Sequence, residues 1–377
     1  DDTLPNETIT DEAFVEQEVT VPNEEMEESS EGVEVTMDEE GGAQIDFDPK
    51  AEGLESQDHF SNLAEIMEDQ YLGELGSTLF DQYTEYKESR ADWENTYREG
   101  LELLGFKYER RTEPFRGASG VNHPVLAEAV TQFQAQAYKE LLPADGPVRA
   151  QILGDISNEK QDQANRVKDF MNYQIMDQMP EYEPEFDQML FYLPLSGSTF
   201  KKIYYDDLLG RAVSKFVPAD DLIVPYSANS LEDAEAIVHV IRMSENEIRK
   251  QQVSGFYKDV EVGNPPVTSN ELKDTELKLE GITKNSNQDQ FNLLEMHVDL
   301  DLEGFEDMGQ DGEPTGIKLP YIVTILESTN EILSIRRNYT EDDPLKEKIK
   351  YFVQFKFLPG TGFYGFGLIH MIGGLTR

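Results

Sequence analysis

The stretch with the most metal-like spacing of oxygen ligands is Asp299-Leu-Asp301-Leu-Glu303-Gly304. Acidic residues stand at positions one, three and five and glycine at position six, as in the first half of a calcium-binding loop. Position twelve, where that loop needs a bidentate glutamate, is Gln310, and both flanks alternate like β-strands instead of helices. Because the chain has 76 acidic residues, such a match arises easily. We therefore expect a hairpin turn here.

The other residue types that perform chemistry are scattered along the chain. The chain has no cysteine, which excludes disulfides, thiolate metal sites and cysteine nucleophiles. Neither a Gly-x-Ser-x-Gly elbow nor a Walker lysine loop is present. No His-x-x-x-His or Glu-x-x-His spacing links the five histidines, which are His59, His123, His239, His297 and His370. We predict no catalytic residue, no cofactor-binding residue, no metal ligand, no cofactor and no enzymatic activity.

Two stretches could contact phosphate. The loop from Gly360 to Gly367 contains four glycines and three aromatic residues, but it lacks the lysine of a phosphate-binding loop. We expect its glycines to provide positive φ or close backbone approach, and its aromatic rings to pin it against a packed surface. Arg110, Arg111 and Arg116 form the one local basic cluster, which could bind a phosphate or a neighbouring subunit's carboxylate. In so acidic a chain we favour pairing with its own carboxylates.

The net charge of −44 limits the partners of this chain. Residues 1–70 hold about 24 acidic residues and a single lysine, Lys50, and the remainder is acidic as well. A protein that grips nucleic acid through its phosphates needs basic surface, which is scarce here. No apolar run approaches the roughly 18 residues that a membrane helix requires, so we expect no membrane partner.

Hydrophobic periodicity predicts an α+β fold in which helices come first and mostly antiparallel strands follow. We expect helices over 63–88, from a capping box at Ser89 to Gly105, and over 123–142, 157–179 and 186–193. A strand hairpin is expected over 198–205 and 211–217, a strand over 234–243 and a capped helix from Ser244. The remaining strands, expected to form one antiparallel meander, are 291–302, 317–326, 331–337 and 351–358.

The chain divides by composition into four parts. Residues 1–57 combine high charge with few aromatic residues, which predicts a disordered acidic tail. Residues 58–196 form a helical part and residues 197–366 a β-rich part. Residues 367–377 begin an apolar helical pattern that is still continuing at Arg377. We expect the chain to be a portion of a longer polypeptide.

Four stretches together resemble the portal proteins of tailed bacteriophages, the head-to-tail connectors, and specifically the long portal chains of short-tailed phages. The first is Asn122-His-Pro-Val-Leu-Ala-Glu-Ala-Val-Thr-Gln-Phe-Gln-Ala-Gln, continuing to Leu142-Pro143. The others are Gly197-Ser-Thr-Phe-Lys-Lys202, Val217-Pro-Ala-Asp-Asp-Leu-Ile-Val-Pro225 and Gly362-Phe-Tyr-Gly-Phe-Gly-Leu-Ile369. The order of these stretches, and the aromatic-glycine turn that leads into a helix, carry the resemblance.

The resemblance implies a structural subunit of a homo-oligomeric ring, a dodecamer of about twelve copies at one capsid vertex. Residues 58–366 would be the peripheral wing domain and residues 367–377 the start of the first stem helix. The ring would form the channel for genome packaging and ejection, with double-stranded DNA passing through it without sequence-specific binding. The implied partners are the major capsid and scaffolding proteins, the terminase motor and the tail adaptors. The implied location is the virion, with assembly in the host cytoplasm.

Two alternatives remain at this point. A metal-dependent, nuclease-like enzyme could use the acidic cluster Asp299–Asp307. An acidic scaffold or adaptor protein without a channel would share the lack of catalytic residues, and only ring closure separates it from a portal subunit.

Overall fold

The computed structural model describes residues 34–37, 43–46, 59–104, 124–154, 157–206, 209–265, 271–282, 290–309 and 312–376. The chain forms two compact units, Asp1–Asp58 and His59–Arg377. In the first unit, β1 (Glu34–Met37) pairs with β2 (Ala43–Asp46) in an antiparallel hairpin. The rest of the predicted disordered tail, residues 1–57, lies outside the described residues.

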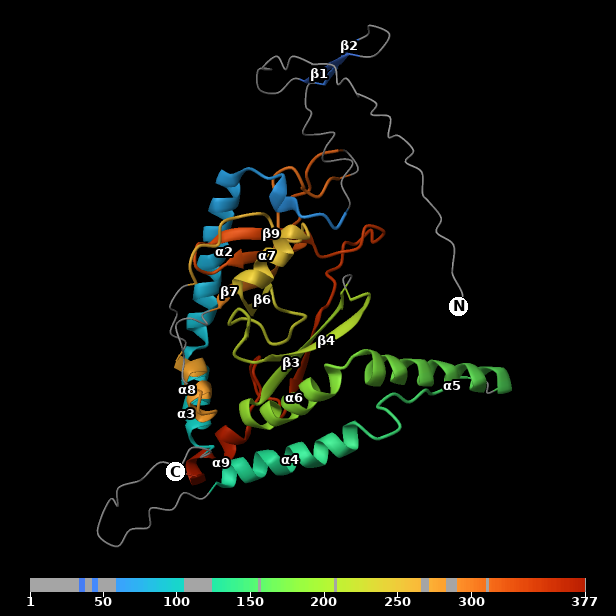
Figure 1. The fold of residues 1–377 in the computed structure, drawn as a ribbon, viewed down its shortest axis with the longest axis vertical. Coiled ribbons are helices and arrows are strands. Elements are labelled where there is room, and N and C mark those ends of the chain that lie inside the picture. The colour runs from blue at the N-terminus through green and yellow to red at the C-terminus, as the bar shows by residue number, and fades with distance from the viewer. Residues whose placement is uncertain are drawn as a thin grey trace, which may run out of the picture. The chain divides into compact units, whose positions relative to one another are not determined.

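The second unit has the predicted α+β fold, with helices first and antiparallel strands after them (Figure 1). Its helices are η1 (Leu63–Glu65), α2 (Asp69–Ser89), α3 (Ala91–Glu102), α4 (Val125–Leu141), α5 (Asn158–Tyr173), the π-helix η2 (Gln174–Gln178), α6 (Tyr182–Ser196), α7 (Glu245–Val253), α8 (Glu271–Leu279) and α9 (Leu368–Thr376). Its strands are β3 (Ser198–Asp206), β4 (Arg211–Pro218), β5 (Leu222–Ile223), β6 (Ala236–Met243), β7 (Phe291–Leu300), β8 (Leu319–Leu326), β9 (Glu331–Arg337) and β10 (Phe352–Lys356).

The larger sheet has the order β5-β6-β7-β8-β9, and every neighbouring pair is antiparallel. Helix α2 runs along this sheet (Figure 1), and its apolar side chains Leu72, Leu79 and Tyr83 join the core on that face. Ile248 of α7 packs in a second cluster with Phe291 and other sheet residues. The sheet is therefore buried by helices, which the apolar content of β8 requires.

The predicted four-stranded meander is correct for three strands and wrong for the fourth. Strands β7, β8 and β9 pair in sequence, but β10 leaves this sheet and pairs with β3 in the order β10-β3-β4. A long polar segment separates β9 from β10, so no tight turn holds β10 beside β9. Phe352 of β10 instead packs with Phe200 and Phe363, which places it on the smaller sheet.

The helix starts were predicted with mixed success. Ser244 and Glu247 form the expected capping box at the start of α7. The box expected at Ser89 is wrong, because α2 continues through Ser89 and α3 begins two residues later. The hydroxyl of Ser89 donates to the Tyr86 carbonyl at 2.7 Å. Arg90 occupies the N-cap position of α3, but its side chain makes no hydrogen bond to the start of the helix.

Candidate functional site

Three glycines from two distant segments bring their backbones into contact. Gly197 ends α6 with φ of +88°, and the loop before α9 crosses it at Gly365 and Gly367. A Cβ atom on Gly197 would lie 2.3 Å from the Gly365 carbonyl oxygen, and one on Gly367 would lie 2.2 Å from the Leu195 carbonyl oxygen. No side chain fits between the two segments. We call this crossing of Gly197, Gly365 and Gly367 the glycine junction.

Hydrogen bonds fasten the glycine junction and use the amides of the loop. The Gly365 amide donates to Ser198 Oγ at 2.7 Å, and the Gly367 amide donates to His370 Nδ1 at 3.1 Å. The Phe366 amide donates to the Leu358 carbonyl at 2.8 Å. A phosphate cradle needs free amides, and these three are occupied. The loop has the structural role that its glycines predict.

A buried arginine links the glycine-aromatic loop to the connection between β4 and β5. Arg90 is only 7% exposed. Its guanidinium donates at 2.9 Å to the carbonyl oxygens of Ala219 and Leu222 and to the hydroxyl of Tyr364. The Tyr364 hydroxyl in turn donates to the Leu222 carbonyl at 3.0 Å. One side chain thus ties α3, the β4–β5 connection and the loop before α9 together.

Aromatic rings close the same region. Trp93 of α3 stacks on Tyr364 with ring centroids 4.6 Å apart and lies 5.5 Å from the ring of Tyr97. Phe200 of β3 stacks on Phe363 at 5.7 Å. The predicted pinning of the loop by its aromatic residues is therefore confirmed for Phe363 and Tyr364. Phe366 remains 44% exposed.

Helix α9 begins between α3, α4 and α6 and contacts all three helices (Figure 1). Ile369 packs there with Leu126 and Val130 of α4 and with Leu195 of α6. Gly100 of α3 makes room for it, since a Cβ atom at Gly100 would lie 2.4 Å from the Ile369 side chain. Glycine inside a helix costs about 1 kcal/mol relative to alanine. A glycine inside a predicted helix is therefore a sequence signal for a close contact, and our sequence analysis did not identify Gly100 in this way.

Beside Arg90 lies a buried group of polar atoms without hydrogen-bond partners: Trp93 Nε1, the Tyr97 hydroxyl, both carboxyl oxygens of Asp220, and Glu276 Oε1. Burial, together with the charges of Asp221 and Glu276, raises the pKa of Asp220 to about 8. The neighbouring carboxylate of Asp221 has partners, because it accepts two hydrogen bonds of 2.8 and 2.6 Å from the guanidinium of Arg242. Asp220 is therefore a carboxyl group that burial keeps protonated at neutral pH.

The acidic stretch at 299–307 is not the tight hairpin turn that we expected: Asp299 lies in β7 opposite Pro320, and residues 301–307 begin a long connection to the antiparallel strand β8. Gly304 turns with φ of +82°. Asp307 is held by Lys346 and by the Thr315 hydroxyl. No three His, Asp or Glu side chains within the described ranges converge so as to hold a metal ion. Gln310 and the basic residues Arg110, Arg111 and Arg116 lie outside those ranges.

Two of the histidines that we took to be scattered meet at one carboxylate. His239 of β6 lies opposite Glu295 of β7 in the sheet register, and His297 follows two residues later on the same face. Glu295 Oε1 lies 2.6 Å from Lys202 Nζ, 2.9 Å from His297 Nε2 and 3.8 Å from His239 Nδ1. Burial opposes the ionisation of Glu295, but Lys202 and the histidines hold its pKa well below the usual value. Only the strand register could reveal this cluster.

None of the described helices combines the length and apolarity needed to cross a bilayer. No protein-family model matches the chain, and no curated protein matches it.

Proposed function

We propose that this chain is a structural subunit of the portal ring of a tailed bacteriophage, which forms the channel for genome packaging and ejection at one capsid vertex. One observation carries the proposal: the four stretches that resemble portal chains, although far apart in sequence, gather around the glycine junction. Gly365 bonds to Ser198, and Tyr364 bonds to Leu222. Ile369 packs on α4. These stretches together fix the position and direction of α9.

In this proposal α9 is the start of the stem helix, and the glycine junction sets its angle to the wing. Loops move on the nanosecond to microsecond timescale, and hinge motions between domains on the microsecond to millisecond timescale, unless packing restrains them. The Arg90 bonds and the Trp93–Tyr364 stack provide that restraint. Each subunit would then present its stem helix at the same angle, which closure of a symmetric ring requires.

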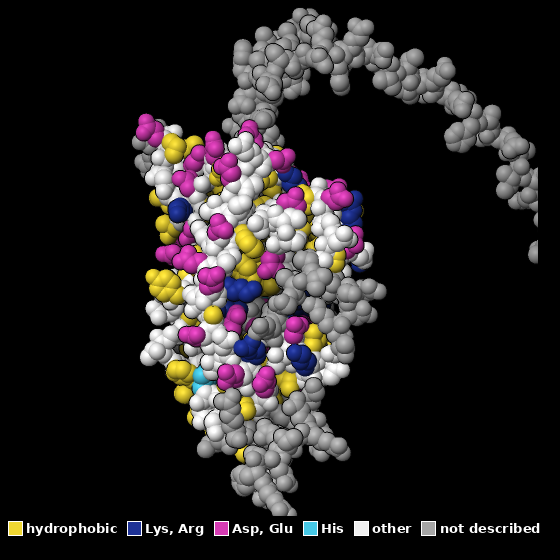
Figure 2. All heavy atoms as spheres, turned by 90° about the vertical axis from the view of Figure 1, so that its left-hand side faces the viewer, with side chains coloured by type: hydrophobic (Ala, Val, Ile, Leu, Met, Phe, Trp, Pro, Cys, Tyr) yellow, Lys and Arg dark blue, Asp and Glu magenta, His cyan; other side chains and the backbone are white. Residues whose placement is uncertain are grey.

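The surface charge supports a channel that passes DNA without gripping it. The side formed by α2 and α3 carries Asp and Glu side chains spread over its surface and fewer Lys and Arg side chains (Figure 2). Each phosphate contact with a basic side chain would add a salt-dependent grip. Acidic surfaces avoid this grip. The partners in this proposal are further copies of the chain, capsid and scaffolding proteins, the terminase motor, tail adaptors and the transported DNA, in the virion.

Ring assembly must overcome repulsion between subunits of net charge −44. Apolar contacts have to supply the attraction, and α5 offers such a surface because none of its residues is buried. Val167, Phe170 and Met171 of α5 are 49%, 59% and 42% exposed. The helix projects from the body of the unit (Figure 1). We assign it to the contact with the neighbouring subunit.

Sedimentation velocity over a series of salt concentrations tests the proposal. Salt screens like-charge repulsion over distances of about 8–10 Å at physiological strength, so subunit association should strengthen from low to physiological salt. Phe170→Asp should weaken association, whereas Val253→Asp, which alters an even more exposed apolar residue on α7, should not. Association that weakens steadily with salt would refute the repulsion argument. An unassociated chain at every salt concentration would refute the ring.

A further inference from the structure

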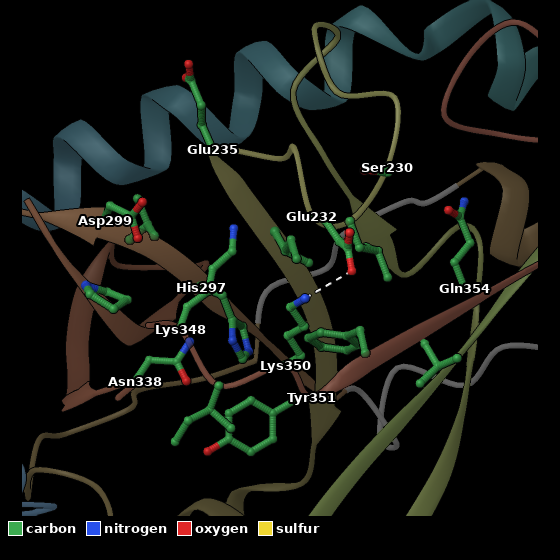
Figure 3. A pocket seen from close by; sticks show the side chains of 17 residues that line it. Ser230, Glu232, Glu235, His297, Asp299, Asn338, Lys348, Lys350, Tyr351 and Gln354 are labelled. Carbon is green, nitrogen blue, oxygen red and sulfur yellow. Dashed lines mark hydrogen bonds and ion pairs between the residues drawn. The ribbon is translucent and has the colours of Figure 1, made fainter. Parts of the chain in front are cut away.

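A pocket of about 400 Å³ lies between the end of the larger sheet and the segment from Lys348 to Gln354 (Figure 3). It lies within the second unit and is separate from the glycine junction. Its size falls in the range of about 300–1,000 Å³ that is usual for small-ligand sites. Its walls are mainly apolar, from Ile237, Val298, Pro320, Ile349 and Phe352. Such a pocket selects its ligand through the few polar groups that face it.

Three of these polar groups are organised by the sheet. Asp299 of β7 lies opposite Pro320 of β8, and the backbone amide of Asn338 donates to the Pro320 carbonyl at 2.9 Å. His297 precedes Asp299 by two residues and therefore faces the same side of β7. Because neighbouring strands lie about 4.8 Å apart, Asp299 and Asn338 stand roughly 10 Å apart with the proline ring between them. Figure 3 shows the three residues on one side of the pocket.

All three groups can accept a hydrogen bond. Asn338 is 2% exposed, and its Oδ1 has no partner. Burial lowers the pKa of His297, so the ring is neutral, and its bond to the ionised Glu295 assigns the ring proton to Nε2. His297 Nδ1 is thereby left as an acceptor. Within the described ranges Asp299 has no salt-bridge partner; burial raises the pKa of its carboxyl group, which the charges of Lys348 and Lys318 oppose.

Three of the donors that line the pocket have hydrogen-bond partners within the described residues. Lys350 Nζ bonds to Glu232 at 3.0 Å, as the dashed line in Figure 3 shows, and closes the opposite side. Lys348 Nζ donates to the Ala234 carbonyl at 3.1 Å. Gln354 Nε2 donates to the Phe363 carbonyl at 2.9 Å. Asn338 Oδ1, in contrast, is a buried acceptor without a partner among the described residues.

We propose that this pocket binds a small organic cation, with a flat or aliphatic apolar body against Pro320 and Phe352, an amidine, guanidine or amine group directed at Asp299, and room for a further N–H donor at Asn338. The apolar walls would bury the body of the ligand. An N–H donor of the ligand at this end of the pocket would satisfy Asn338 Oδ1, which is buried without a partner among the described residues. The carboxylate of Asp299 would supply a charge-assisted bond.

A matched ligand series tests the proposal on the unmodified protein. Benzamidine, benzamide and benzoate share one aromatic ring and differ in charge. Isothermal titration, with ligand-detected NMR for weak binding, should rank benzamidine first, with benzoate bound at least ~10-fold more weakly, as expected for one charge-assisted bond. Equal binding of the three ligands, preference for benzoate, or no binding of benzamidine at millimolar concentration would each overturn the proposal.

Two variants with opposite expected effects on the affinity for benzamidine locate the site. Asp299→Asn should weaken benzamidine binding about 10-fold. Lys348→Met keeps the aliphatic stem and removes a cation that acts on Asp299, so it should strengthen the binding. Glu102→Gln removes one carboxylate from α3, which does not line the pocket, and should leave the affinity unchanged. Stronger binding in Asp299→Asn together with weaker binding in Lys348→Met would indicate an anion site and refute the proposal. A loss of affinity in Glu102→Gln equal to that in Asp299→Asn would indicate a general charge effect and would refute it as well.

Discussion

Replacing Gly197 by alanine tests whether the glycine junction holds the fold as described. Two penalties would act at this residue. The first is conformational, because φ is +88°, a region that L-residues with a Cβ atom adopt at a cost of about 1–2 kcal/mol. The second is steric, because the new Cβ atom would lie 2.3 Å from the Gly365 carbonyl oxygen and 2.5 Å from the Gly367 amide nitrogen. Both contacts are with backbone atoms, which cannot rotate away.

The steric penalty can be measured by comparison with a second glycine. Gly210, in the turn between β3 and β4, also has positive φ, of +62°, but a Cβ atom there would meet no atom within 4 Å. Gly210→Ala should therefore lower the free energy of unfolding by the conformational cost alone, about 1–2 kcal/mol. Gly197→Ala adds overpacking, which costs about 1–3 kcal/mol or more. We expect a total loss of about 2–5 kcal/mol for Gly197→Ala.

Urea denaturation followed by tryptophan fluorescence measures both losses. Trp93 is the only tryptophan and stacks on Tyr364 beside the glycine junction, so its emission reports on this region. The difference between the two variants should reach at least about 1 kcal/mol. Equal losses would mean that the loop before α9 can move away from Gly197 at little cost. The account of how α9 is positioned would then be wrong.

Two further predictions concern the buried charges next to the junction. Because the pKa of Asp220 rises from 3.8 to about 8 on folding, the folded chain retains a proton that the unfolded chain loses, so the free energy of unfolding should fall as pH rises from about 4 to 8, by up to about 1.4 kcal/mol per pH unit. Asp220→Asn should remove this slope in urea titrations across that range, and an unchanged slope would contradict the assignment. Arg90→Met would leave the carbonyl oxygen of Ala219 without its donor and that of Leu222 with Tyr364 alone, and should cost about 3–5 kcal/mol, with Arg90→Lys recovering only part. A loss below about 1 kcal/mol for Arg90→Met in thermal or urea unfolding would refute its role.

The sequence predicted the elements better than their partners. The apolar spacing of Leu75, Leu79 and Tyr83 predicted a helix, and the alternation in β3 and β4 predicted a hairpin, because both patterns are local. The partner of β10 is not a local property. It depends on Phe352 finding the aromatic residues Phe200 and Phe363, which no spacing rule reveals.

The same limit applies to the functional residues. The glycines at 365 and 367 indicated close backbone approach, but not that Gly197 lay opposite them. Arg90 resembled an ordinary surface arginine beside an expected cap. Arg90 lies between the end of α2 and the start of α3, and its side chain is buried because it reaches the carbonyl oxygens of Ala219 and Leu222, far along the chain. The acceptors at His297, Asp299 and Asn338 come from two segments about 40 residues apart, and only the sheet brings them to one pocket.

Native mass spectrometry together with negative-stain images tests the central claim most directly. The measurement should use the natural protein at physiological salt. The portal proposal predicts a closed ring of about twelve copies with a central hole. A monomer or dimer under all salt conditions would contradict the channel and leave an acidic scaffold or adaptor as the function to test.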